Sequence, residues 1–68
     1  MPGTYKITEL VGTSPASFAE ATKAAVAEAA KTLRNMEWFQ VVEERGKIKD
    51  GAVAEFQVTV KIGFKIER

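Results

Sequence analysis

The clearest pattern along the chain is a regular alternation of apolar and polar residues near its C-terminal end. Successive side chains of a strand point to opposite faces of a sheet, so alternation predicts a strand with one buried face. Here it predicts a long strand over residues 52–66. The apolar positions of that strand are Phe56, Val58, Val60, Ile62, Phe64 and Ile66.

Two other stretches also predict strands. Residues 4–11 are rich in β-formers and roughly alternate, and residues 37–49 directly precede the long strand. Asp50-Gly51 lies between the last two strands, and Asp-Gly accepts the positive φ angles of a two-residue hairpin turn. Gly12-Thr13 is expected to form the turn after the first strand.

A helix is predicted over about residues 15–34. Eight of these residues are alanine, the best helix former. Ser14 is a suitable N-cap, and Pro15 suits the first helical position because its missing N–H does no harm there. An apolar stripe at helical spacing is expected to face the sheet. Its members are Phe18, Ala21, Ala25, Ala29 and Leu33.

These elements follow one another in the order β-α-β-β. The predicted fold is therefore of the α+β class, with a three-stranded antiparallel sheet packed against one helix. Residues 1–68 are expected to form a single domain, close to the smallest size that folds without help. The chain has no cysteine, so no disulfide supplies that help, and oligomerisation is the remaining common route to stability.

The length of the last hairpin also favours assembly. The thirteen residues 54–66 of the last strand extend to about 43 Å at roughly 3.3 Å each. A compact domain of this size has a diameter of only about 28 Å. The hairpin must therefore curl strongly or overhang the rest of the domain, and an overhanging, half-apolar strand pair is an assembly surface.

Composition argues against several functional classes. Ten basic and nine acidic residues are mixed along the chain, which does not favour nucleic-acid binding. No stretch approaches a membrane span, and the first residues lack the features of a signal peptide, so a cytoplasmic protein is expected. The chain has no histidine, so Thr13 and Ser14 lack the usual base to activate them. Neither an enzyme nor a metal site is expected.

Trp38, the only tryptophan, is the strongest candidate for a functional residue. A two-residue hairpin loop pairs Trp38 with Gly63 and Glu44 with Gln57. Trp38 and Gln57 then share the face away from the helix, about six residues or ~20 Å apart along the sheet. A bulge at Gly46 would reverse this assignment. An indole on that face needs a cover, which could be a partner subunit, a flat ligand, or both.

Several segments, taken in order and spacing, resemble the dodecins, a family of small flavin-binding proteins that assemble as hollow shells of twelve subunits. The resemblance covers nearly the whole chain. Its segments are Val11-Gly12-Thr13-Ser14-Pro15, Lys31-Thr32-Leu33-Arg34, Trp38-Phe39-Gln40-Val41-Val42-Glu43, Arg45-Gly46, Asp50-Gly51 and Phe56-Gln57-Val58-Thr59-Val60-Lys61-Ile62-Gly63-Phe64.

The resemblance implies a function and a site. It implies a homododecamer that stores or sequesters a flavin without catalysing a reaction. In dodecins the tryptophan at the position of Trp38 stacks on the isoalloxazine ring, and the glutamine at the position of Gln57 hydrogen-bonds the polar edge of that ring. Flavins bind in pairs between tryptophans of symmetry-related subunits. Electron transfer from the indole quenches the excited flavin and limits light damage.

The identity of the ligand stays open at this level. Arg45 matches the bacterial type of the family, whereas the archaeal members carry an acid near this point. A guanidinium there could attract a phosphate and favour FMN over riboflavin, with Lys65 or another cation assisting, or it could form an ion pair. FAD and coenzyme A are further candidate ligands. The alternative function is a structural or protein-interaction homo-oligomer that binds no cofactor.

Overall fold

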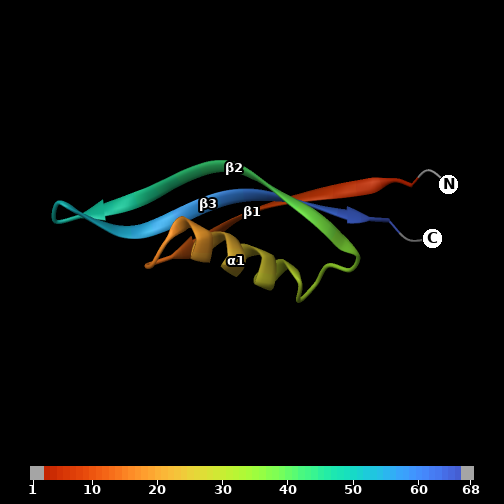
Figure 1. Ribbon diagram of the computed structural model, residues 1–68, viewed down its shortest axis with the longest axis horizontal. Coiled ribbons are helices and arrows are strands. Elements are labelled where there is room, and N and C mark those ends of the chain that lie inside the picture. The colour runs from red at the N-terminus through yellow and green to blue at the C-terminus, as the bar shows by residue number, and fades with distance from the viewer. Residues whose placement is uncertain (1–2, 67–68) are drawn as a thin grey trace.

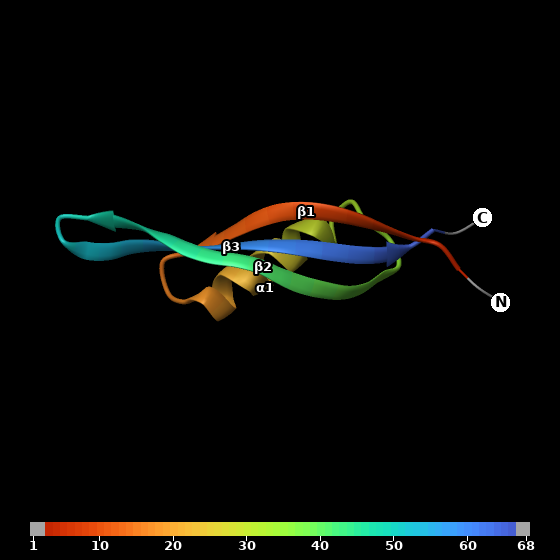
Figure 2. The ribbon, with the colours of Figure 1, turned by 90° about the horizontal axis from the view of Figure 1, so that it is seen from above.

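The computed structural model describes residues 3–66 as one helix packed against a three-stranded sheet. The elements are β1 (Tyr5–Ser14), α1 (Phe18–Ala29), β2 (Met36–Lys49) and β3 (Ala52–Lys65). β3 lies between β1 and β2 and is antiparallel to both, as Figure 2 shows. The helix covers one face of this sheet (Figure 1). The predicted order and fold class are confirmed.

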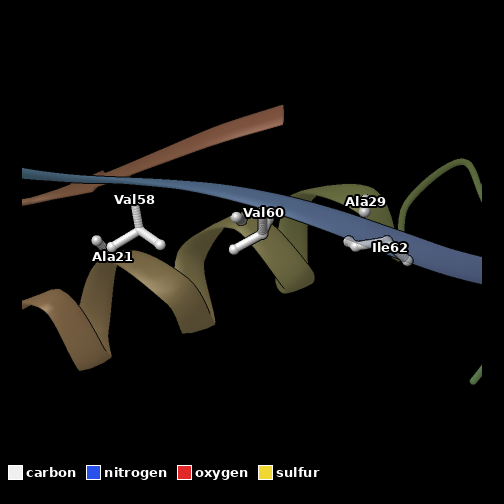
Figure 3. Close-up of a cluster of buried hydrophobic side chains, with 6 residues drawn as sticks. Ala21, Ala29, Val58, Val60 and Ile62 are labelled. Carbon is white, nitrogen blue, oxygen red and sulfur yellow. The ribbon is translucent and has the colours of Figure 1, made fainter. Parts of the chain in front are cut away.

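A small core joins the helix to the central strand. Val58, Val60 and Ile62 of β3 are at most 1% exposed and point at α1 (Figure 3). The alanines Ala21, Ala25 and Ala29 meet them from the helix, as the predicted apolar stripe required. Partly buried side chains surround this cluster, namely Leu10, Phe18, Val26, Leu33 and Met36.

Small side chains let the helix approach the sheet closely. A Cβ at Gly12 of β1 would clash with the carbonyl oxygen of Ala21 and would lie 2.8 Å from the Cβ of Ala25. Gly12 therefore allows close contact between β1 and α1. The prediction that Gly12-Thr13 forms a turn is wrong, because both residues pair with β3 inside the strand.

The helix is shorter than predicted and begins later. Ser17, not Ser14, is the N-cap, and its side-chain oxygen accepts a hydrogen bond of 3.0 Å from the backbone N–H of Glu20. Ser14 ends β1, and its hydroxyl oxygen accepts a hydrogen bond of 2.9 Å from the N–H of Ala16. Pro15 therefore lies in the connection and not in the helix.

The C-terminal end of the helix also differs from the prediction. α1 stops at Ala29, and the next residues form turns closed by hydrogen bonds such as that from the N–H of Lys31 to the carbonyl of Glu28. Asn35 then takes a φ of 61°, a left-handed conformation that asparagine tolerates. The chain thereby reverses into β2 with Arg34 outside the helix.

The predicted hairpin turn is confirmed. Lys49 pairs with Ala52, and both intervening residues have positive φ angles, 53° at Asp50 and 77° at Gly51. The hairpin does not curl back onto the domain. It extends past the helix at one end of the molecule (Figure 1), whose extents are 53 × 20 × 13 Å. The exposed fractions of Ile48 and Val53 near its tip are 77% and 62%.

Three irregularities interrupt the pairing of β2 with β3. Glu37 and Val42 are extra residues on β2, and Ala54 is an extra residue on β3. The bulges at Ala54 and Val42 have opposite effects on the register, so the alignment is displaced by one residue between them and returns after Val42, until the bulge at Glu37 shifts it again at Met36.

These bulges correct part of the predicted register. Within the displaced segment Gln57 lies opposite Arg45, not Glu44, and Glu44 instead lies opposite Val58. Glu43 pairs with Thr59, which places it on the face away from the helix. Outside the segment Trp38 lies opposite Gly63, as predicted.

Within residues 3–66 there is no helix long and apolar enough to cross a membrane.

Candidate functional site

Trp38 lies on the sheet face opposite the helix, above a position of the central strand that has no side chain. Its cross-strand neighbour is Gly63, and a Cβ at that position would collide with Cε2 and Cζ2 of the indole. The indole therefore occupies space that any other residue at position 63 would fill. The residue remains 41% exposed, so part of the ring stays open to a ligand or a partner.

The ring of Tyr5 reaches the indole from the other outer strand. Its ring centroid lies 5.0 Å from that of Trp38, with the two planes at 54°. Its hydroxyl donates a hydrogen bond of 3.1 Å to Oε1 of Glu37. This hydrogen bond, together with the negative charge of the carboxylate, raises the pKa of the Tyr5 phenol. Glu37 is the extra residue of a bulge in β2. The bulge explains why its carboxylate lies on the same side of the sheet as the ring of the next residue, Trp38.

A polar network occupies the same face nearer to the hairpin turn. Nε of Arg45 donates a hydrogen bond of 2.8 Å to Oε1 of Gln57, and Nη1 of Arg45 lies 2.7 Å from Oε1 of Glu43. Nε2 of Gln57 donates a hydrogen bond of 3.0 Å to Glu55, which also faces Lys47 at 3.7 Å. The Gln57 amide is thus held in a defined orientation.

The network still leaves binding groups for a ligand. A primary amide has two N–H donors and two acceptor lone pairs, and each end of the Gln57 amide uses one of them in these contacts. A guanidinium has five donors, of which Arg45 uses two. The side chains of Arg45 and Glu43 are 49% and 57% exposed, so this cluster is open to solvent in the single chain.

The structure brings two of the three predicted site residues together. Arg45 contacts Gln57, but Trp38 does not join them, because Gly63 and Gln57 are six residues apart on β3. Six residues of strand span ~20 Å. Lys65 pairs with Tyr5 at the Trp38 end of the sheet, far from Arg45 in the same chain. A single chain therefore presents the candidate site in two separate parts, an aromatic half-site and a polar half-site.

Further concave surface lies on the helix side. A pocket of 190 Å³ between α1 and β2 is lined by Val26, Met36, Glu37, Trp38, Phe39 and Ile62. A larger groove of 630 Å³ runs beside the helix past Phe39. Both are mostly apolar, and neither includes Gln57 or Arg45. Within residues 3–66 there is no group of three acidic side chains that could hold a metal ion.

Two contacts of the site were not anticipated from the sequence. Glu55 could have been found, because residues i and i+2 of a strand share a face and Glu55 stands two before Gln57. Glu37 could not have been found, because regular alternation places it on the face opposite Trp38. Only the bulge brings it to the same face.

Comparisons with known proteins cover nearly the whole chain. The family model described as Dodecin matches residues 4–67. A dodecin of Thermus thermophilus is 49% identical over 63 residues, covering 93% of this chain and 91% of that protein. The structure of dodecin from Streptomyces coelicolor has a TM-score of 0.94 and 48% identity, covering 97% of this chain and 94% of that chain. Dodecin from Streptomyces davaonensis has a TM-score of 0.95 and 43% identity, covering 100% of both chains.

The close seating of Trp38 over Gly63 leads to a prediction. In Gly63→Ala the added methyl group must displace the indole, because a rigid ring cannot yield locally as a flexible side chain would. The near-ultraviolet circular dichroism of Trp38 is expected to weaken and its fluorescence emission to shift to longer wavelength, with the far-ultraviolet spectrum preserved. Lys47→Ala, at the opposite end of the sheet, is the control. An unchanged indole spectrum in Gly63→Ala would show that Trp38 is not held against Gly63.

Proposed function

The chain belongs to the dodecin family, and from this we propose that it is a non-enzymatic flavin-binding protein that assembles as a homododecamer. The proposed ligand is FMN, with riboflavin and FAD as related candidates and coenzyme A as a possible second type of ligand. The proposed role is storage or sequestration of the flavin, with protection against light. The proposed site residues are Trp38, Gln57 and Arg45.

The observation that carries the proposal is the half-exposed indole of Trp38 on the helix-free face of the sheet. A single tryptophan held there offers a large, electron-rich surface, and the flat, electron-poor isoalloxazine ring is complementary to it. Electron transfer from the indole to an excited flavin requires a short distance between the two rings, and stacking supplies that contact. Trp38 is thus proposed both to bind the flavin and to quench its fluorescence.

Gln57 supports the same proposal through its hydrogen-bonding capacity. The pyrimidine edge of a flavin alternates C=O and N–H groups, and a primary amide carries both complementary types. Arg45 and Glu55 hold the amide by its two ends, which reduces the rotamer freedom that binding would otherwise remove. The unused donors of Arg45 could meet a phosphate beside the ring.

Assembly supplies what one chain lacks. Trp38 and Gln57 are too far apart within a subunit to hold one ring between them, so the proposed site is composite, with contributions from neighbouring subunits. Apolar side chains outside the core agree with this need for partners. Those at least 41% exposed are Tyr5, Ile7, Val11, Trp38, Phe39, Val41, Val42, Ile48 and Val53.

The competing function is a homo-oligomer without a cofactor, in which Trp38 only packs subunits together. The exposed hairpin side chains Ile48 and Val53 are compatible with that function as well. The colour of freshly purified native protein separates the two: bound flavin makes it yellow, and an interaction module is colourless. Mass analysis of the released ligand would then identify which flavin it is.

The first prediction concerns the assembly. Light scattering on a size-exclusion column is expected to give about twelve times the 7.4 kDa subunit mass, because a core of this size covers too little of the sheet. A folded, stable monomer at micromolar concentration would contradict the proposed assembly.

The second prediction separates stacking from hydrogen bonding. Trp38→Ala is expected to form the intact oligomer but to lose most of the flavin affinity and nearly all of the quenching. Gln57→Ala is expected to weaken binding by about 1–3 kcal/mol through unmade hydrogen bonds, while bound flavin stays quenched. The measurement is flavin titration followed by fluorescence, with Gln40→Ala as a control amide. If Trp38→Ala binds and quenches like the parent, the stacking role is wrong, and if it fails to assemble, Trp38 is an interface residue.

The third prediction concerns the phosphate. Arg45→Glu is expected to weaken FMN by up to roughly 3 kcal/mol more than riboflavin, since only FMN loses a charge-assisted hydrogen bond. The salt dependence of FMN binding should fall as well. Lys49→Glu reverses the charge of a cation on the same strand that takes no part in the hydrogen bonds and ion pairs of this network, and serves as the control. An equal loss for both ligands would assign Arg45 to assembly or to orienting Gln57.

A further inference from the structure

The aromatic half-site contains a second ring whose geometry gives it a specific role. Tyr5 and Trp38 come from β1 and β2, the two outer strands, which are separated by β3. Neighbouring strands lie ~4.8 Å apart, so side chains of two outer strands are normally kept apart by the side chain between them. Gly63, opposite Trp38, provides no such side chain, and Tyr5, which pairs with Lys65 two residues further along β3, reaches the indole diagonally at a centroid distance of 5.0 Å.

Three groups then limit where the indole can move. Gly63 leaves the space that the six-membered ring fills, and Tyr5 stands beside the indole in a tilted contact. The Tyr5 hydroxyl is held in turn by the Glu37 carboxylate at 3.1 Å. Glu37 is adjacent to Trp38 in sequence, so the hydrogen bond ties the Tyr5 ring of β1 to the segment that carries the indole. The Tyr5 side chain is thus held in two places, at its ring by the indole and at its hydroxyl by Glu37.

We infer that Tyr5 is a positioning residue that holds the Trp38 indole in the orientation that stacks on the flavin. The expected effect of Tyr5 on flavin binding rests on the proposed function. The claim that Tyr5 holds the indole does not. An indole on a solvent-facing sheet loses rotamer freedom when a ligand binds, and a neighbour that holds it beforehand reduces that loss. Tyr5 need not touch the ligand to have this effect.

The chain is well suited to a spectroscopic test, because Tyr5 is its only tyrosine and Trp38 its only tryptophan. Tyr5→Leu removes the ring, and Tyr5→Phe keeps the ring but removes the hydrogen bond to Glu37. Val11→Ala is the matched control, since Val11 is a half-exposed apolar residue on the same face of β1 but pairs with Thr59, away from the indole. All variants are compared with the parent as intact oligomers at equal concentration.

The flavin-free protein is measured first. In Tyr5→Leu the fluorescence anisotropy of Trp38 is expected to fall and its near-ultraviolet circular dichroism to weaken, whereas Val11→Ala should match the parent. Flavin titration is expected to show affinity weakened roughly two- to ten-fold in Tyr5→Leu, the equivalent of one aromatic contact. The effect in Tyr5→Phe should be smaller, and flavin bound at saturation should remain quenched in both variants.

The outcomes separate this inference from the proposed function. If the parent binds no flavin, the proposed function fails, and the anisotropy of the flavin-free protein still decides whether Tyr5 holds the indole. Parental anisotropy in Tyr5→Leu would overturn the positioning role, whatever the flavin affinity. If Tyr5→Leu does not assemble, Tyr5→Phe decides: a fall in its Trp38 anisotropy supports the role, and an unchanged value overturns it.

Discussion

A single short helix has to cover a sheet well over twice its length, and most features of this molecule follow from that mismatch. α1 has twelve residues and is therefore about 18 Å long, whereas the fourteen residues of β3 extend to about 46 Å. The helix buries the middle of β3 at Val58, Val60 and Ile62 and leaves the strand ends with apolar side chains in solvent. Alanine side chains bring the helix close but add little apolar surface. A single chain consequently leaves much of its sheet uncovered, which supports the proposed assembly.

The same constraint explains why the candidate site is divided. The helix-free face carries an aromatic half-site near the chain termini and a polar half-site toward the hairpin turn, and the length of the sheet keeps them apart. Each half is locally ordered: Gly63 and Tyr5 surround Trp38, and Arg45 and Glu55 orient Gln57. A ligand that contacts both halves would therefore have to bridge two chains, as the proposed composite site requires.

Much of the fold could be predicted from the sequence, because the relevant signals are local. The alternation in residues 52–66 and the Asp50-Gly51 turn identified the hairpin and its buried face. The helix start was misplaced because Ser14 and Pro15 resemble a cap, although Ser17 and Glu20 carry the stronger S-x-x-E pattern. Gly12 and Thr13 were taken for a turn because strand pairing depends on a partner 46 residues away at Val58, which no local pattern reports. The bulges at Glu37, Val42 and Ala54 likewise depend on how two long strands twist together, and they decide that Arg45, not Glu44, faces Gln57.

The central claim is that Trp38 and Gln57 of different subunits form one flavin site, and co-assembly of two variants that each bind flavin more weakly tests it most directly. Trp38→Ala and Gln57→Ala subunits are unfolded together, refolded as mixed oligomers, and titrated with flavin beside each variant alone. If the site is composite, some sites in the mixture combine an intact Trp38 with an intact Gln57, and high-affinity, quenched binding returns to a fraction of them. A mixture that binds no better than the average of the two separate variants would contradict the claim, because it would mean that both residues act from the same chain.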